Sequence, residues 1–184
     1  MVKIEVFCGF LESGKTTLIQ HALEQNYMGA YGRILVLRCE EGMEELHADT
    51  RKNRGVVLSR IGDLQKIRSE LFRRIKEQVA PDLILIEYNG TWPVERLLRT
   101  GLPEGYKIDR ILFCADAETF GLTINNTGSL MKNQLSNADS VHFNRCGPDR
   151  QPLEAAAFPL NRTAELYFDQ AGTDRYLAAV FDQR

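Results

Sequence analysis

Short apolar runs alternate with longer segments of helical period along most of the chain. Two of the runs, 83–86 and 111–115, contain no polar residue, as expected for strands that are covered on both faces. Strands that alternate with helices require βαβ crossovers, so the pattern predicts an α/β fold with a mostly parallel sheet and helices on both faces. The predicted strands are residues 3–8, 33–37, 83–86, 111–115, 141–143 and 165–168.

Helical spacing is clearest in residues 16–25 and 63–79, where apolar side chains recur at steps of three or four. Asp63 is predicted to be the N-cap of the second of these helices. The segments 39–60 and 121–128 lack a clear period, and we expect both to be mobile loops. In this fold class such loops gather at the carboxyl ends of the strands, where ligands bind.

Length and composition are those of an ordinary globular domain. The 184 residues are 43% apolar and 26% charged, and their net charge of −2 offers no overall attraction for nucleic acid. No apolar stretch is long enough to cross a bilayer, so we expect no membrane insertion. The four cysteines are scattered without a CxxC pair, which favours a reducing, cytoplasmic location.

The most specific pattern lies between the first predicted strand and the helix that follows it. Residues 9–16, Gly-Phe-Leu-Glu-Ser-Gly-Lys-Thr, match G-x-x-x-x-G-K-[ST] at every fixed position. Such a loop wraps an anion with its backbone N–H groups and the positive end of the helix dipole. We expect Lys15 to reach the β- and γ-phosphates and the Thr16 hydroxyl to bind Mg²⁺. Residues 1–184 are thus predicted to form a single P-loop domain with the Rossmann-like, three-layer architecture of P-loop NTPases.

A second element of chemistry follows the apolar run 83–86, which ends in Glu87. A carboxylate there can hold the Mg²⁺ shell through water or orient the attacking water, as in a Walker B element. Gly90 would let a backbone N–H approach the γ-phosphate closely. The alternatives are an ordinary charged residue at the end of a strand and a plain turn glycine.

An acidic cluster follows the predicted strand 33–37. One interpretation places Glu40 on the nucleotide Mg²⁺ and leaves Cys39, His47 or Asp49 for a transition metal. The other interpretation is a solvated acidic loop.

Together these motifs resemble the CobW-like metallochaperone GTPases, relatives of the nickel-insertion GTPases of urease and hydrogenase. Residues 9–19 resemble the phosphate loop of that family nearly letter for letter, and residues 87–90 fit its E-x-x-G. Residues 39–42, Cys-Glu-Glu-Gly, are similar to its N-E-x-G segment, and residues 115–120 are similar to its V-D-A segment. Gln134 falls in its helix before the strand that reads the base.

The resemblance implies a GTPase cycle, with GTP and Mg²⁺ as cofactors and a protein partner that receives a metal or cofactor. It implies that Glu40 contributes to the Mg²⁺ site and that Asn144 and Arg145 lie at the base; a homodimer follows by analogy alone. The catalytic residues are then Lys15, Glu40 and Glu87, and the magnesium ligands are Thr16 and Glu40. The expected nucleotide-binding residues are Gly9, Glu12, Ser13, Gly14, Lys15, Thr16, Thr17, Gly90, Asn144 and Arg145.

The sequence departs from the family pattern in three places. The Cys-x-Cys-Cys metal motif should fall near residues 57–62, where no thiol is present. The guanine-reading N-K-x-D aligns with residues 144–147, so that Gly147 stands in place of the Asp and Asp149 lies two residues later. We also expect residues 1–184 to correspond to the nucleotide-binding domain alone, without the family's usual C-terminal domain.

These observations leave two main hypotheses. The first is a Mg²⁺-dependent NTPase, with GTP as its preferred substrate, that hydrolyses slowly and drives a partner. The alternative is a nucleotide-gated binding module with weak or lost hydrolysis and relaxed specificity for ATP or GTP, which the departures in the base and metal motifs favour. A small-molecule kinase is a weaker third reading, because no acceptor-binding motif precedes Glu87.

Overall fold

The computed structural model describes residues 1–40, 46–47 and 55–182. Within these residues, seven strands form one sheet in the order β3-β2-β4-β1-β5-β6-β7, and every neighbouring pair is parallel. The strands are β1 (Val2–Cys8), β2 (Ile34–Arg38), β3 (Val56–Arg60), β4 (Leu83–Glu87), β5 (Tyr106–Asp116), β6 (Ser140–Asn144) and β7 (Glu165–Tyr167). The predicted α/β class with a parallel sheet is confirmed.

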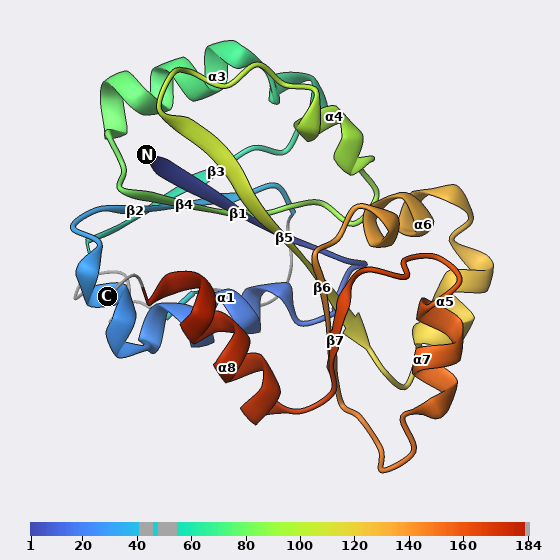
Figure 1. Cartoon of the computed structure of the whole chain (residues 1–184). Helices are drawn as coiled ribbons and strands as arrows, with labels where there is room; N and C mark the ends of the chain where they lie inside the picture. Colours follow the sequence, from blue (N-terminus) through green and yellow to red (C-terminus); the bar gives the residue numbers. More distant parts are fainter. Residues whose placement is uncertain (41–45, 48–54, 183–184) are drawn as a thin grey trace.

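Helices cover both faces of this sheet (Figure 1). The helices are α1 (Lys15–Glu24), α3 (Ser69–Arg74), α4 (Val94–Leu98), α5 (Phe120–Asn126), α6 (Ser129–Ser136), α7 (Gln151–Ala157) and α8 (Gln170–Phe181). Shorter turns of helix are η1 (Asn26–Ala30), η2 (Leu64–Lys66) and the π-helical η3 (Ile75–Val79). None of the described helices is long and apolar enough to cross a membrane.

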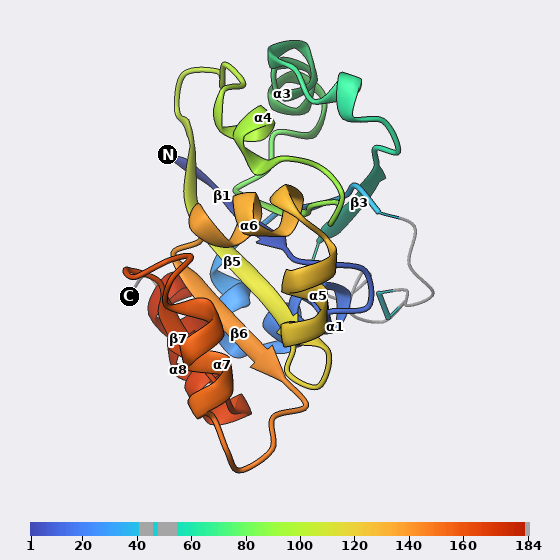
Figure 2. The same ribbon diagram turned by 90° about the vertical axis from the view of Figure 1, so that its right-hand side faces the viewer.

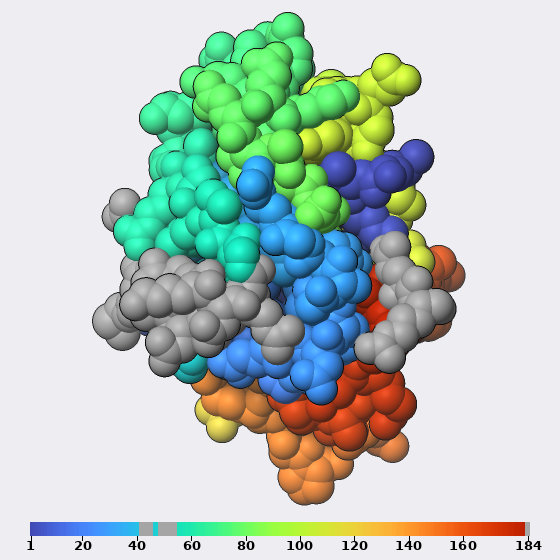
Figure 3. All heavy atoms as spheres, turned by 90° about the vertical axis from the view of Figure 1, so that its left-hand side faces the viewer, coloured from blue at the N-terminus to red at the C-terminus, as the bar shows by residue number. Residues whose placement is uncertain are grey.

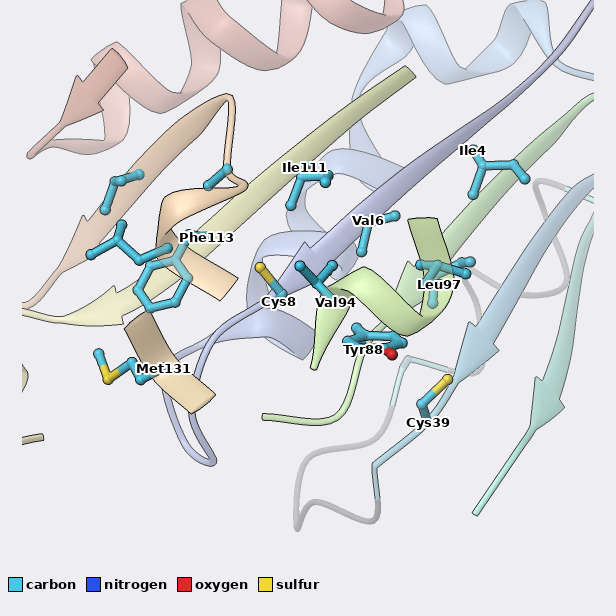
Figure 4. Packing of buried hydrophobic residues seen from close by; sticks show 14 of the residues in the cluster. Ile4, Val6, Cys8, Cys39, Tyr88, Val94, Leu97, Ile111, Phe113 and Met131 are labelled. Carbon is cyan, nitrogen blue, oxygen red and sulfur yellow. The ribbon is translucent and has the colours of Figure 1, made fainter. Parts of the chain in front are cut away.

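The alternation of side chains along β1 divides the core into two clusters. Ile4, Val6 and Cys8 point to the face that α3 to α7 cover (Figure 4), whereas Phe7 points to the face of α1 and α8. Figure 2 shows α5, α6 and α7 on one side of the molecule, and Figure 3 shows the opposite side, where the blue segment around η1 lies beside the teal and green segments around β3 and α3. The three-layer architecture thus buries both faces of the strands, which explains their uninterrupted apolar runs.

The predicted helix 63–79 is wrong in its first half. Asp63 caps only the short η2, by accepting a hydrogen bond from the Gln65 backbone N–H at 2.8 Å. Ile67 is fully buried, and Arg68 has an extended backbone, so α3 begins only at Ser69. The apolar period continues across this break because η2 and α3 pack on the same face of the sheet.

Both predicted loops contain regular structure. Residues 56–60 of the first one form β3, an edge strand whose half-exposed side chains gave only a weak apolar signal. Residues 121–126 of the second lie in α5, which Phe120 and Ile124 anchor because both are buried and lie one helical turn apart. Both stretches were therefore wrongly predicted as loops, because only a few apolar residues hold β3 and α5 against the rest of the protein.

Glu5 is a charged residue type in the centre of the sheet. Its side chain is fully buried, and among the described residues neither of its carboxylate oxygens has a hydrogen-bond partner. Burial raises the pKa of Glu5 to about 8; Asp109 adds to the increase, and Lys3 and Arg110 partly offset it. The folded protein therefore holds this carboxyl protonated at neutral pH, although it ionises near 4.5 when exposed.

We expect Glu5 to make the folded state less stable as the pH rises. Because its folded pKa lies above its unfolded pKa, its stabilising contribution is complete below about pH 4.5 and is lost as the pH rises through about 8. Between about pH 5.5 and about pH 8 the loss is on the order of 3 kcal/mol. Glu5→Gln removes this titration. Between these two pH values, the free energy of unfolding of the variant, measured in urea, should therefore rise by that amount relative to wild type. A constant difference at both pH values would contradict the prediction.

Candidate functional site

The loop between β1 and α1 has backbone angles that only glycine adopts easily. Gly9 and Gly14 have φ values of 124° and 87°, in the region that favours glycine. A Cβ on Gly9 would lie 2.1 Å from the Cys114 carbonyl oxygen, so no other residue fits there. Gly14 is the N-cap of α1, and no side-chain hydrogen bond caps this helix among the described residues. An uncapped helix N-terminus that follows such a loop is suited to binding an anion.

Lys15 lies inside this loop rather than in solvent. Its Nζ donates to the carbonyl oxygens of Gly9 at 2.9 Å and Phe10 at 2.7 Å. It also forms an ion pair with Glu40 Oε2 at 2.7 Å, and its side chain is only 2% exposed. The ammonium is thus held at the centre of the loop, beside the Glu40 carboxylate, which the sequence had suggested only as a contributor to the Mg²⁺ site.

Glu87, at the end of β4, connects two other polar side chains. Its Oε1 accepts from the Thr16 hydroxyl, and its Oε2 accepts from Arg38 Nε. All three side chains are buried. Arg38 was not among the predicted site residues, although a charged residue at the end of the apolar strand β2 was a visible signal. Arg38 and Glu87 are opposite each other in the register of β2 and β4, which explains their pairing.

Gly90 brings a second backbone segment against the loop. A Cβ there would lie 2.6 Å from the Gly9 carbonyl oxygen and 2.8 Å from Phe10 Cα. The Gly90 backbone N–H donates to Glu40 Oε1 at 3.3 Å, and Asn89 Nδ2 donates to the Cys39 carbonyl at 3.2 Å. The structure therefore joins the 87–90 segment, residue 40 and the phosphate loop in one place.

Gln134, in α6, connects the same two segments from below and is fully buried. Its Oε1 accepts from the Gly9 backbone N–H at 2.9 Å. Its Nε2 donates to the carbonyl oxygens of Asn89 at 2.9 Å and Trp92 at 2.8 Å. Gln134 matches the family pattern, but no role could be predicted for it from the sequence, because all of its partners lie more than 40 residues away in the chain.

The carboxyl end of β6 lies on the other side of the loop. Asn144 Nδ2 donates to the Ser13 carbonyl at 2.7 Å. Arg145 has a φ of 53°, pairs with Asp116 at 2.9 Å and donates to the Glu12 carbonyl at 3.1 Å. These contacts place Asn144 and Arg145 beside the phosphate loop. Ser13, Thr17 and Asn144 line a neighbouring cavity of about 310 Å³.

The possible transition-metal ligands do not come together among the described residues. Cys39 is buried in the core (Figure 4), where burial and then the charges of Glu87 and Glu40 raise its pKa to about 12. His47 is exposed and lies 3.4 Å from Glu24. Asp49 and most of the acidic cluster lie outside the described residues. In the part of the chain that the structure covers, no three His, Cys, Asp or Glu side chains form a metal site.

Comparisons with solved structures find the same fold in several proteins. HypB, a hydrogenase maturation factor from Archaeoglobus fulgidus, superposes with a TM-score of 0.66 at 17% identity, over 98% of this chain and 88% of that chain. HypB from Helicobacter pylori, solved in complex with nickel, gives 0.61 at 13% identity, over 98% and 86%. The signal recognition particle receptor FtsY from Elizabethkingia anophelis, in complex with GDP, gives 0.55 at 13%, over 100% and 65%.

Identities this low show a shared fold and no more, and comparison with curated proteins gives no match. A family model covers most of the chain, however. The model of the CobW/HypB/UreG nucleotide-binding domain matches residues 3–156, which include the phosphate loop, Glu40, the 87–90 segment and residues 144–145. The chain therefore belongs to the CobW/HypB/UreG family of nucleotide-binding domains, as its motifs predicted.

Proposed function

We propose that residues 1–184 form a single P-loop domain that binds GTP with Mg²⁺ and hydrolyses it slowly to drive a protein partner. The observation that carries this proposal is the convergence of Lys15, Thr16 and Glu87 at the carboxyl ends of β1 and β4. These are the side chains that phosphoryl transfer in P-loop enzymes requires: a cation for the phosphates, a hydroxyl for the metal ion and a carboxylate beside it.

The donor set at this site fits Mg²⁺, which prefers oxygen ligands. The Thr16 hydroxyl contacts the Glu87 carboxylate, and the Glu40 carboxylate contacts Lys15. We assign Thr16 and Glu40 as the residues that would hold the ion, and Glu87 as the carboxylate that contacts its water shell. When bound, Mg²⁺ would neutralise charge on the β- and γ-phosphate oxygens.

Hydrolysis forms a bond from a water oxygen to the γ-phosphorus and breaks the bond to the β–γ bridging oxygen, giving GDP and phosphate. Lys15 stabilises the negative charge that develops on the leaving oxygen, and Glu87 orients the attacking water. The contacts of Glu87 with Thr16 and Arg38 fix the direction of this carboxylate. The Arg38 guanidinium is bound to Glu87 and is not available to the γ-phosphate. We therefore expect GTP hydrolysis to be slow until a partner binds.

The alternative, a binding module with lost hydrolysis and relaxed base specificity, is supported by two features of the sequence. Gly147 stands where the family has its base-reading Asp, and residues 57–62 contain no thiol. In this alternative, the segments around Glu40 and Gly90 would report the γ-phosphate to a partner without turnover. Under either function we propose that the protein acts in the cytoplasm, with a protein partner and as a homodimer.

Displacement of a fluorescent GTP analogue tests the proposal. We expect GTP and GDP to compete more strongly than ATP and ADP. Removal of Mg²⁺ with EDTA should weaken the binding of the triphosphates more than that of the diphosphates. Failure of all four nucleotides to compete would refute nucleotide binding. Single-turnover measurement of phosphate release then separates the two functions, because bound GTP that never releases phosphate, even with partner present, supports the binding module.

A further inference from the structure

Three of the elements that line the cavity of about 310 Å³ beside the phosphate loop are distant from one another in the sequence. Thr17 and Leu18 come from the first turns of α1, and Asn144 and Arg145 come from the end of β6. The third wall is the connection from β7 to α8, which contributes Phe168 and Asp169. No motif in the sequence drew attention to this connection.

Asp169 carries a carboxylate on the wall of this cavity. Its Oδ1 accepts from the Gly172 backbone N–H at 2.6 Å, which makes Asp169 the N-cap of α8. Its Oδ2 accepts from Arg150 at 3.2 Å, and its side chain is 48% exposed. Each carboxylate oxygen has two lone pairs, so both oxygens keep capacity to accept a further donor. The Gly172 hydrogen bond lowers the pKa of Asp169, so this carboxylate is ionised at neutral pH.

Aromatic contacts fix the position of the β7–α8 connection. The rings of Phe168 and Phe143 stack with centroids 5.2 Å apart. The rings of Tyr167 and His142 stack at 4.9 Å, and burial lowers the pKa of His142 to about 3, so its ring is neutral. The Asp169 carboxylate is therefore held on a packed support rather than on a freely moving loop.

The positions that the sequence offered for a base-reading carboxylate do not contribute to this cavity. Gly147 has no side chain, and a Cβ built there would meet no described atom within 4 Å. Asp149 accepts from the Gln151 backbone N–H at 3.1 Å and is not among the residues that line the cavity. Of the three positions, only Asp169 places a carboxylate there.

We propose that Asp169 is the residue that selects guanine, in place of the Asp that Gly147 has replaced. A carboxylate only accepts hydrogen bonds, which matches the adjacent N1–H and N2–H donors of guanine. The corresponding edge of adenine presents the N1 lone pair, which an ionised carboxylate repels. This inference rests on the proposed function, because it requires that the phosphate loop binds a nucleotide.

Asp169→Asn is the informative variant because asparagine is as good an N-cap as aspartate, so α8 should be preserved. The affinities of GTP, inosine triphosphate and xanthosine triphosphate are measured for wild type and variant. Wild type should prefer GTP over inosine triphosphate, which lacks the 2-amino group, by about tenfold. The variant should lose most of this preference and bind xanthosine triphosphate about tenfold more tightly, since its amide can donate to the 2-carbonyl group.

Asp149→Asn is the matched control, because it makes the same chemical change in a carboxylate outside the cavity. The control should keep the wild-type preferences. If Asp169→Asn also keeps them, or if Asp149→Asn shifts them instead, Asp169 does not select the base. Those results would leave the proposed function intact, whereas wild-type protein that binds none of the three triphosphates would refute the proposed function itself.

Discussion

Replacing Lys15 with alanine is expected to weaken the binding of GTP and ATP by roughly a hundredfold. The Lys15 ammonium is almost fully buried and is held by two loop carbonyls and Glu40. In this position it is surrounded by little water, so its attraction for phosphate oxygens is weakly screened. Its loss should affect both nucleotides equally, since a phosphate contact does not distinguish bases. Displacement of a fluorescent nucleotide measures the change, with the exposed Lys66→Ala as the control.

The same substitution leaves Glu40 without its cation, and a fall in folded stability could by itself reduce binding. The double variant Lys15→Ala, Glu40→Gln removes the unpaired carboxylate and should recover most of the lost thermal stability. Because Glu40 is also assigned to Mg²⁺, the double variant is compared with Glu40→Gln alone, and it should bind nucleotide much more weakly than that single variant if Lys15 contacts the phosphates. Wild-type affinity in the single variant would show that Lys15 makes no such contact.

A methyl group at Gly90 is expected to weaken triphosphate binding by roughly tenfold or more. In Gly90→Ala the new Cβ would meet the Gly9 carbonyl oxygen at 2.6 Å and Phe10 Cα at 2.8 Å. Both are backbone atoms of the phosphate loop, so the loop or the 87–90 segment must move. Overpacking of this kind costs about 1–3 kcal/mol, and 1.4 kcal/mol corresponds to about a tenfold change in affinity.

The effect of Gly90→Ala should come from this contact alone, because the backbone of Gly90 is not in the left-handed region. Gly62→Ala is a suitable control, since its Cβ would have no described atom within 4 Å. Thermal unfolding and nucleotide affinity are measured for both variants. Unchanged affinity in Gly90→Ala would mean that the close approach of the two segments is not required for binding.

The sequence predicted the fold well where the physics is local. Strands buried on both faces read as unbroken apolar runs, and the run 83–86 lies within β4. The phosphate loop was predictable for a similar reason, because Gly9, Lys15 and Thr16 belong to one continuous segment. The edge strand β3 was missed because one side of an edge strand faces solvent and needs fewer apolar residues.

Site residues that depend on sheet pairing could not be predicted in the same way. Arg38 meets Glu87 only because β2 lies next to β4, and Gln134 meets Gly9 only because α6 packs below the loop. Asp169 reaches its cavity through the packing of the β7–α8 connection. Each of these contacts joins positions far apart in the chain, and their side chains match no short motif.

The strand order also determines when, during folding, the phosphate loop can form contacts with its neighbouring segments. β1 lies between β4 and β5, where Phe7 is opposite Glu87 and Cys8 is opposite Phe113. The loop is therefore synthesised well before it can be completed, because β4 and β5, the two strands that flank β1 in the sheet, come later in the chain. The glycine-rich loop therefore lacks its native contacts until β5 has been synthesised. Such long-range strand pairing slows folding.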